Sequence, residues 1–221
     1  MDEASPFAGI DVVDVELGSR LIPYHEAWQL QREIHQQVVS GEARNTLLLL
    51  EHESVYTAGS RTQPEDLPID GSEVVKVDRG GRITWHGPGQ LVGYPIIRLP
   101  HPMDVVAHVR AMESFLIDIC SDFGVKGDRI TDRSGVWVSH NDQQNKVAAV
   151  GVRVSHGVTM HGFALNCNCD LSWANPIVPC GIRDAGVTSL SRETGTEITT
   201  GAAAAAIKHR LHRLTNSPVG T

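Results

Sequence analysis

A pair of long strand-like segments separated by a short turn is the feature that most restricts the possible folds of this 221-residue chain. Residues 146–154 and 159–169 are rich in valine, alanine and other apolar residues, and Gly157 lies between the two segments. This pattern predicts a β-hairpin. Further strands are predicted by short apolar runs at 47–50, 74–77 and 136–138. We therefore expect an antiparallel sheet that contains the hairpin.

Three helices are expected around these strands. Residues 103–123 carry apolar side chains every three or four positions, which is the spacing of one helix face. Residues 23–39 follow this spacing more loosely, and the alanine run at 202–206 is preceded by Thr199 and Thr200, which can cap a helix. Helices that are separated from a block of antiparallel strands indicate an α+β fold. We expect a single domain over residues 1–221, with helices packed on one side of one mostly antiparallel sheet.

Charge and hydropathy exclude several classes of function. The net charge of -7 argues against nucleic-acid binding, because proteins that follow a phosphate backbone are usually basic. No apolar run approaches the ~20 residues of a membrane-spanning helix. Residues 1–18 contain five acidic residues and no basic one, which does not suit a secretory signal, so we expect a cytoplasmic protein. The four cysteines are then expected to remain free.

Three of the cysteines fit a structural role. Cys120 lies on the apolar stripe of segment 103–123 and is expected in the core. Cys167 and Cys169 continue a strand-like alternation whose other members are His161, Phe163 and Leu165. The alternative is a zinc site of His161 and these two cysteines, but zinc-binding cysteine pairs usually have roughly two to four residues between them and need a second ligand pair. We therefore predict no metal site.

Cys180 has different surroundings. It follows Pro179 and precedes Gly181, in a segment that neither helical nor strand periodicity covers. The proline restricts the approach of the chain, and the glycine permits backbone angles that other residues rarely adopt. A thiol in such a loop can be exposed and aimed at a substrate. Cys180 is therefore a candidate nucleophile, although an incidental loop cysteine fits the same pattern.

The segment 78–90 is the most unusual part of the sequence, with four glycines and one proline in thirteen residues. Glycines allow the backbone to approach a ligand closely, and exposed backbone N–H groups can bind a carbonyl or an anion. The segment lacks the Gly-Lys-Ser/Thr ending of a phosphate loop and the glycine spacing of a dinucleotide fingerprint. A tight structural connection is the alternative, and His86 by itself fits a hydrogen-bonded structural histidine.

Four blocks of the sequence, in the same order, resemble the signatures of lipoyl(octanoyl) transferases. The first is Arg79-Gly80-Gly81 followed by Thr84 and by His86-Gly87-Pro88-Gly89-Gln90. The others are Lys146 to Arg153, His161-Gly162-Phe163-Ala164-Leu165-Asn166, and Pro179-Cys180-Gly181-Ile182. The resemblance covers residues 79–182 and implies the α+β catalytic-domain fold of biotin and lipoate protein ligases.

The resemblance implies an acyltransferase that moves octanoyl from acyl carrier protein to a lysine of a lipoyl domain, the first step of lipoate synthesis. The acceptors would be E2 subunits of 2-oxoacid dehydrogenases and the glycine cleavage H protein, and the enzyme would be a monomer. It implies Cys180 as the acyl-thioester nucleophile and Lys146 as the residue that lowers the pKa of that thiol. The implied substrate-binding residues are Arg79, Gly80, Gly81, Arg82, Ile83, Thr84, Trp85, His86, Ala149, Val150, Gly151, Gly162, Phe163 and Ala164.

No cofactor is expected, because octanoyl arrives already activated as a thioester on the phosphopantetheine of the carrier. The attacking species is the thiolate, and a cysteine with an ordinary pKa of about 8.5 supplies only a few per cent of it at neutral pH. A nearby ammonium favours the charged form, which is the role implied for Lys146. An ATP-dependent lipoate-protein ligase and a lipoyl amidotransferase on the same fold are the alternatives.

The partner proteins raise a question of charge. Acyl carrier proteins are generally acidic, and this chain is acidic too, so association requires a local basic patch. The basic residues near the first signature block are Lys76, Arg79, Arg82 and Arg98. We expect these residues to dock the carrier, with ordinary surface charge as the alternative.

Overall fold

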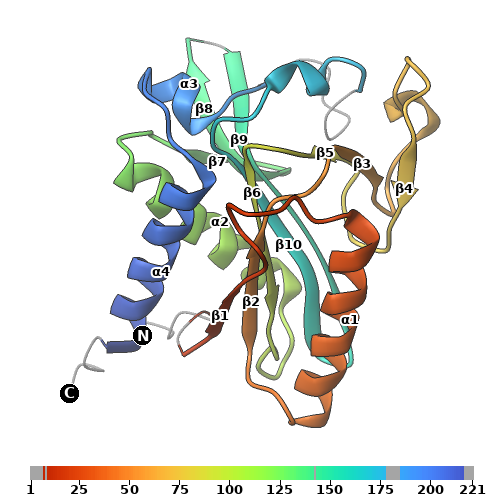
Figure 1. The fold of residues 1–221 in the computed structure, drawn as a ribbon, viewed down its shortest axis with the longest axis vertical. Helices are drawn as coiled ribbons and strands as arrows, with labels where there is room; N and C mark the ends of the chain where they lie inside the picture. Colours follow the sequence, from red (N-terminus) through yellow and green to blue (C-terminus); the bar gives the residue numbers. More distant parts are fainter. Residues whose placement is uncertain (1–6, 8, 142, 178–184, 217–221) are drawn as a thin grey trace.

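The computed structural model describes residues 7, 9–141, 143–177 and 185–216 (Figure 1). Its centre is a mixed, mainly antiparallel sheet of eight strands in the order β1-β2-β6-β10-β9-β8-β7, with β11 paired to β9. The strands are β1 (Asp11–Asp14), β2 (Thr46–Leu50), β6 (Gln90–Ile96), β7 (Asp128–Ile130), β8 (Arg133–His140), β9 (Gln143–Ser155), β10 (Val158–Asn166) and β11 (Ala185–Val187).

A second, smaller sheet and four helices complete the described part of the chain. The small sheet has the order β4-β3-β5, with β3 (Val55–Ala58), β4 (Val74–Lys76) and β5 (Ile83–His86). The helices are α1 (Tyr24–Ser40), α2 (Val105–Asp122), α3 (Leu190–Thr194) and α4 (Thr200–Asn216). Two short 3₁₀ turns, η1 (Pro64–Asp66) and η2 (Leu171–Ala174), lie in the connections. The predicted α+β class is confirmed, and a helix or strand lies at each predicted segment, but the strand expected at 74–77 belongs to the small sheet, so the expectation of one sheet is wrong.

Helices cover both faces of the main sheet, so the expectation of helices on one side is wrong. Leu48 and Leu50 of β2 pack in a cluster with residues of α1, whereas Leu47 and Leu49 pack in a second cluster with residues of α2 and α4. Successive side chains of a strand point to opposite faces. The unbroken leucine run of β2 is therefore the pattern of a strand that is buried on both sides.

Local sequence explains where the main elements begin and end. Asp104 caps α2, because its side chain accepts the N–H of Ala107 at 2.8 Å. The predicted hairpin is formed by β9 and β10, and its two turn residues, His156 and Gly157, have φ angles of 52° and 75°. Such positive φ angles at both central positions belong to the two-residue turns that suit the twist of a hairpin.

The predicted alternation along β10 breaks at two places. The strand ends at Asn166, so Cys167 and Cys169 lie beyond it; the N–H of Cys167 instead donates to the Gly89 carbonyl at 3.1 Å. The backbone of His161 has a φ of 58°, which is rare for a residue with a side chain. Its ring lies against α1, whereas the Phe163 ring lies in the core on the side of α2. The predicted common face for His161 and Phe163 is therefore wrong.

Candidate active site

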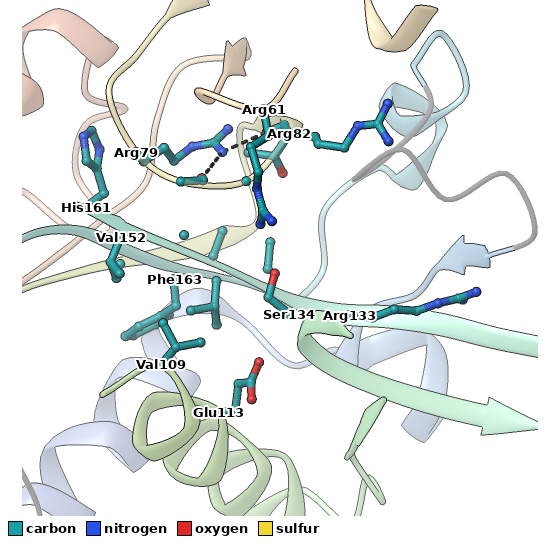
Figure 2. Close-up of a pocket in the computed structure, with 18 of the residues that line it drawn as sticks. Arg61, Arg79, Arg82, Val109, Glu113, Arg133, Ser134, Val152, His161 and Phe163 are labelled. Atoms are coloured by element: carbon teal, nitrogen blue, oxygen red, sulfur yellow. Dashed lines mark hydrogen bonds between the residues drawn. The ribbon is translucent and has the colours of Figure 1, made fainter. Parts of the chain in front are cut away.

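A cleft of about 880 Å³ lies between the glycine-rich loop, the β9–β10 hairpin and the beginning of α2. Figure 2 shows the loop with Arg79 and Arg82 on one side of this cleft and Val109 and Glu113 of α2 on the other. Most residues expected to bind substrate line it: Arg79, Gly80, Gly81, Arg82, Ile83, Thr84, His86, Ala149, Val150, Gly151, Gly162, Phe163 and Ala164, together with Lys146. The fold thus brings three of the four sequence blocks to one cavity.

The guanidinium of Arg79 holds the glycine-rich loop in place from inside the protein. The residue is only 7% exposed, and its side chain donates to the carbonyl and hydroxyl of Thr57, both at 2.8 Å, and to the carbonyl of Arg82 at 2.8 Å. A buried arginine satisfies its donors in this way because an unpaired buried charge is costly. Arg79 therefore shapes the cleft, and its contacts do not support the expected role in docking a carrier protein.

Glycines let the loop lie directly on the hairpin. The N–H of Gly80 donates to the carbonyl of Val152 at 2.9 Å, and a Cβ added at Gly151 would lie 3.0 Å from the carbonyl oxygen of Gly80. A side chain at Gly59 would lie 2.6 Å from both the Arg79 guanidinium and the Gly81 carbonyl. The glycine-rich pattern is thus explained by close backbone packing, which places loop backbone at the cleft wall.

Trp85 faces a different cavity from its neighbours. Its indole N–H donates to the Ser54 hydroxyl at 2.9 Å, and its ring stacks on Trp173 at 6.2 Å between centroids. The ring lines a smaller pocket of about 50 Å³, which also contains Thr84, Lys146 and Ala149. The expectation that Trp85 faces the main cleft with the other loop residues therefore does not match its position.

Neutral histidines lie at the cleft and next to it. Burial lowers the pKa of His86 well below its ordinary value, and its Nδ1–H donates to the Gln90 side-chain oxygen at 2.8 Å. Burial also lowers the pKa of His52 to about 4, and this ring accepts the hydroxyl hydrogen of Tyr94 at 2.7 Å. Desolvation disfavours the charged imidazolium in both cases. The histidines present hydrogen-bonding groups without positive charge.

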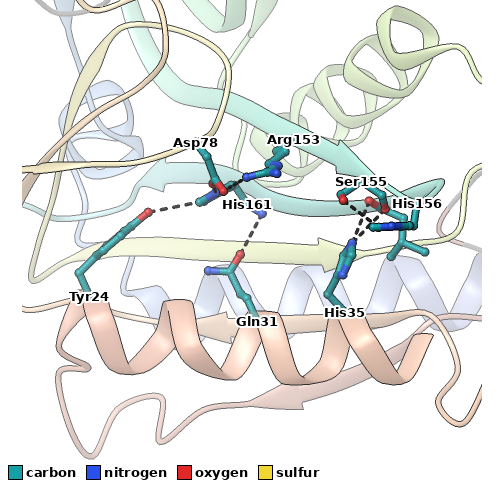
Figure 3. Close-up of polar contacts among 9 residues, drawn as sticks. Tyr24, Gln31, His35, Asp78, Arg153, Ser155, His156 and His161 are labelled. Carbon is teal, nitrogen blue, oxygen red and sulfur yellow. Dashed lines mark hydrogen bonds and ion pairs between the residues drawn. The ribbon is translucent and has the colours of Figure 1, made fainter. Parts of the chain in front are cut away.

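His161 connects the glycine-rich loop to α1 (Figure 3). Its Nε2–H donates to the Asp78 carboxylate at 2.7 Å, and Arg153 donates to the same carboxylate. The side-chain oxygen of Gln31 accepts the backbone N–H of His161 at 2.8 Å. Burial lowers the pKa of His161 to about 3, so the ring is a neutral donor. In the sequence, His161 stands out as a strand residue, an alternative metal ligand and part of the third signature block, but no local pattern marks its long-range pairing with Asp78.

Lys146 lies at the junction of the two cavities. It lines both the large cleft and the small pocket, is 6% exposed, and its Nζ atom lies 4.5 Å from the centre of the Trp137 ring. Cys180, the expected nucleophile, falls outside the described residues. The described chain on either side of it, Ile177 and Val187, lines the small pocket together with Lys146. Val187 is also the direct partner of Lys146 across the β11–β9 pairing.

The other three cysteines are buried in apolar surroundings, as predicted for Cys120. Burial raises the pKa of the Cys120 thiol and of the Cys169 thiol to about 12, and it also raises the pKa of Cys167. The described residues contain no group of three or more histidine, cysteine or acidic side chains placed to hold a metal ion. His161 uses its ring nitrogens on Asp78 and Tyr24, away from the two cysteines. Thiols with raised pKa values are poor nucleophiles.

The four candidate docking residues do not form one patch. Arg82 makes a paired contact with the buried carboxylate of Asp66 at 2.7 Å. Arg98 donates to the carbonyls of Val38 and Val39 at the end of α1. Lys76 is exposed on β4 of the small sheet. Only Lys76 among them retains an exposed side chain beside the glycine-rich loop.

Within the described residues, no helix is long and apolar enough to cross a membrane.

Comparison with known proteins assigns this chain to a family. Residues 23–212 match the family described as lipoyl protein ligase A/B catalytic domain. The chain is 55% identical over 206 residues to an octanoyltransferase of Salinispora tropica, covering 92% of this chain and 96% of that protein. It is 53% identical over 201 residues to an octanoyltransferase of Thermobifida fusca, covering 88% and 85%.

A solved structure shares the fold at much lower identity. The bipartite lipoate protein ligase from Thermoplasma acidophilum aligns with a TM-score of 0.66 at 12% identity, covering 94% of this chain and 83% of that one. This likeness confirms the expected fold of the catalytic domain. With high identity to octanoyltransferases over most of its length, the chain belongs to the lipoyl protein ligase A/B catalytic-domain family, together with the octanoyltransferases.

Proposed function

We propose that this chain transfers an octanoyl group from an acyl carrier protein to a lysine of a lipoyl domain, through a thioester on Cys180. The acyltransferase class follows from the octanoyltransferases that match most of the chain. The observation that carries the mechanism is the position of Lys146, a buried cation at the junction of a large cleft and a small pocket. A cation at that point can stabilise a thiolate that forms beside it.

The described residues on both sides of Cys180 support its assignment as the nucleophile. The N–H of Thr188 donates to the carbonyl of Lys146 at 3.0 Å, and Val187 pairs with Lys146 across β11 and β9. Ile177, which precedes the segment that contains Cys180, lines the same pocket as Lys146. The remaining thiols are buried and have raised pKa values, which disqualifies them as nucleophiles.

The proposed reaction has two half-reactions. In the first, the Cys180 thiolate attacks the thioester carbonyl of the donor; the bond to the carrier's sulfur breaks, and that sulfur leaves as a thiol after taking a proton from the Lys146 ammonium, which becomes neutral. In the second, the amine of the acceptor lysine attacks the Cys180 thioester, an amide forms, and the Cys180 thiolate is released. The proton lost by the amine goes to Lys146 in its neutral form. Atoms and charge balance without ATP.

The walls of the cleft suit both parts of an acyl thioester. Apolar side chains from three elements, Val109, Val150 and Phe163, can bury the alkyl chain at about 0.8 kcal/mol per methylene. Backbone of the glycine-rich loop at Gly80 and Gly81 lines another part of the cleft, next to strand β9. Polar backbone groups of the loop can orient the amides of the phosphopantetheine arm.

The proposal is tested by intact mass spectrometry after incubation with octanoyl acyl carrier protein. We expect a single octanoyl adduct that maps to the peptide containing Cys180 and disappears when a lipoyl domain is added, with octanoyl then on the domain. Cys180→Ser should show no thioester adduct, and Cys120→Ser serves as the matched control that keeps it. Transfer should proceed without ATP or added metal.

Three results would count against the proposal. A requirement for ATP and free octanoate or lipoate would indicate a ligase that uses an acyl adenylate. Transfer to the lipoyl domain at an undiminished rate by Cys180→Ser would show that the acyl group passes directly from donor to acceptor. A donor preference for an acylated lipoyl domain over acyl carrier protein would instead indicate an amidotransferase.

A further inference from the structure

Strand β8 builds the site in which the side chain of Lys146 lies. Trp137 and Lys146 are direct partners across the antiparallel β8–β9 pairing, so their side chains lie on the same face of the sheet. The Nζ atom lies 4.5 Å from the ring centre, within the range of a cation–π contact, for which tryptophan is the best ring. Trp137 is 2% exposed, so this contact is largely shielded from water.

A β-bulge is what brings the two side chains together. Val136 pairs with Ala148, and a regular antiparallel register would then pair Trp137 with Val147. The register instead shifts by one residue, and Trp137 pairs with Lys146. A one-residue shift turns a side chain to the other face of a strand. Without the bulge, Lys146 would point away from the ring.

Gly135 leaves space for the lysine side chain at the start of this bulge. It has a φ of 105°, and an added Cβ would lie 2.4 Å from the carbonyl oxygen of Ala148 and 3.4 Å from Cε of Lys146. Its N–H donates to Glu113 Oε1 at 2.8 Å. The Glu113 carboxylate is fully buried and is held by Arg110 at 2.8 Å and Arg129 at 3.3 Å. Helix α2 therefore anchors the backbone that Lys146 packs against.

Packing alone does not explain a tryptophan at position 137. Its indole N–H is buried without a hydrogen-bond partner among the described residues. A buried unsatisfied donor costs free energy that phenylalanine or leucine would avoid. What the indole supplies in return is a large, electron-rich face beneath an ammonium group.

We propose that Trp137 is a positioning residue for Lys146: the face of its ring holds the ammonium at the junction of the two cavities. The inference rests on the proposed function, because it concerns the lysine assigned there to the thiolate. The nearest alternative cation is Arg133, whose guanidinium lies 5.9 Å from the same ring. Other charged residues that line the two cavities are Arg61, Arg79, Arg82, Arg110, Glu113, Asp132 and Asp170.

The test is the pH dependence of the alkylation rate of Cys180 by iodoacetamide, followed on its tryptic peptide. The proteins compared are wild type, Trp137→Leu, Trp137→Phe, Lys146→Met and the double variant Trp137→Leu/Lys146→Met. We expect Trp137→Leu to move the midpoint of the profile upward by about half to one pH unit, and Trp137→Phe to move it less. In the Lys146→Met background, Trp137→Leu should cause no further shift, because the ring acts through the lysine.

A matched control uses another tryptophan that carries a cation on its face. The Arg32 guanidinium lies 4.0 Å from the centre of the Trp28 ring on α1, outside the lining of either cavity. Trp28→Leu should leave the alkylation midpoint unchanged. If Trp137→Leu does not fold, fluorinated tryptophans introduced at position 137 by amber suppression keep the shape of the ring and reduce its negative face, and the midpoint should rise with each added fluorine.

The outcomes separate the inference from the function on which it rests. An unchanged alkylation midpoint in Trp137→Leu, or a fluorination series without a trend, overturns the positioning role of Trp137. The proposed mechanism stays in place if the midpoint is shifted in Lys146→Met. The same shift in the presence and absence of Lys146 would overturn it too, because the ring would then act through Arg133 or through packing. If Lys146→Met itself has the wild-type midpoint, the role of Lys146 in the proposed function fails, and the inference fails with it.

Discussion

His161 donates its Nε2 hydrogen to the carboxylate of Asp78 over 2.7 Å, although 83 positions separate the two residues in the sequence. Arg153 reaches the same carboxylate from β9, and Tyr24 and Gln31 reach His161 from α1 (Figure 3). The pair therefore joins the start of the glycine-rich loop to β10 and α1. Since the loop forms one wall of the cleft, this contact links the stability of the fold to the shape of the site.

Removing the Asp78 carboxylate should destabilise the protein more than removing a surface carboxylate. Asp78→Ala leaves the buried His161 donor without its partner, so we expect the free energy of unfolding to fall by about 2 kcal/mol. Asp122→Ala is the matched control, because Asp122 pairs with Arg210 at the surface, at 2.6 Å. Exposed pairs contribute about 0–1 kcal/mol. Urea unfolding measures both, and equal losses would contradict the linking role of Asp78.

Stability should fall as the pH drops below 7. Burial lowers the pKa of His108 to about 4, that of His52 to about 4 and that of His161 to about 3. Between these values and the ordinary value near 6.5, the unfolded chain binds protons that the folded chain does not. Each of these histidines therefore costs about 1 kcal/mol of stability at pH 5.5 relative to pH 7.5.

His108 offers a direct check of this pH dependence. Neither of its ring nitrogens has a hydrogen-bond partner among the described residues, and it packs at 6.3 Å from Phe7. His108→Phe should reduce the stability difference between pH 7.5 and 5.5 by about 1 kcal/mol. His209→Gln, at an exposed position of α4, is the control that should leave the difference unchanged. Urea unfolding at the two pH values distinguishes the variants.

A methyl group at position 151 should displace the glycine-rich loop. The Cβ of Gly151→Ala would lie 3.0 Å from the Gly80 carbonyl oxygen and 3.3 Å from Cδ of Arg79. We expect a loss of octanoyl transfer of about tenfold or more, because the loop wall must move away from β9. The expected change in the free energy of unfolding is smaller, about 1 kcal/mol.

Gly201→Ala provides the matching glycine substitution outside the site. Gly201 lies in the first turn of α4, and the nearest atom to an added Cβ is the Thr199 hydroxyl at 3.8 Å. Alanine should stabilise this helix by about 0.5–1 kcal/mol and leave transfer unchanged. Full transfer activity in Gly151→Ala would show that the loop tolerates displacement.

Charge reversal at Arg98 should affect stability and leave the affinity for donor protein unchanged. Its guanidinium donates to the Val38 and Val39 carbonyls at 2.6 and 2.9 Å, where a cation also suits the dipole of α1. Arg98→Glu should lower the free energy of unfolding by about 1–2 kcal/mol. Lys76→Glu, on exposed β4, should cost little stability. A higher KM for carrier-bound octanoyl in Arg98→Glu would restore Arg98 to the docking surface.

Much of the fold follows from patterns that are local in the sequence. The hairpin around Gly157, the apolar stripe from Met112 to Leu116 and the buried leucine run at 47–50 are periodic over a few residues. Backbone geometry converts such a period directly into a helix or a strand with one buried face. The burial of Cys120 could be anticipated for the same reason. The glycine-rich loop could be anticipated from its composition.

The sequence does not predict some side-chain positions, either because the backbone departs from a regular period or because the contact is long-range. The left-handed backbone of His161 reverses the strand alternation, so His161 and Phe163 lie on opposite sides of the sheet. Trp85 faces the small pocket because its ring stacks on Trp173, which is 88 positions away by number and has no local signature. Arg79 and Arg98 satisfy backbone carbonyls of the protein itself. The charge of a residue in the sequence does not show whether that residue bonds within the protein or docks a partner protein.

Local residue patterns were sufficient to predict the three longest helices and the strands β2, β4, β8, β9 and β10, and the four ordered sequence blocks were sufficient to predict the family. Tertiary packing was needed to show that Lys146 lies over the ring of Trp137 and that Asp78 meets His161. Both contacts depend on single-residue irregularities, a bulge between β8 and β9 and a positive φ in β10. Periodicity averages over several residues, whereas a one-residue shift changes which side chains meet across a sheet.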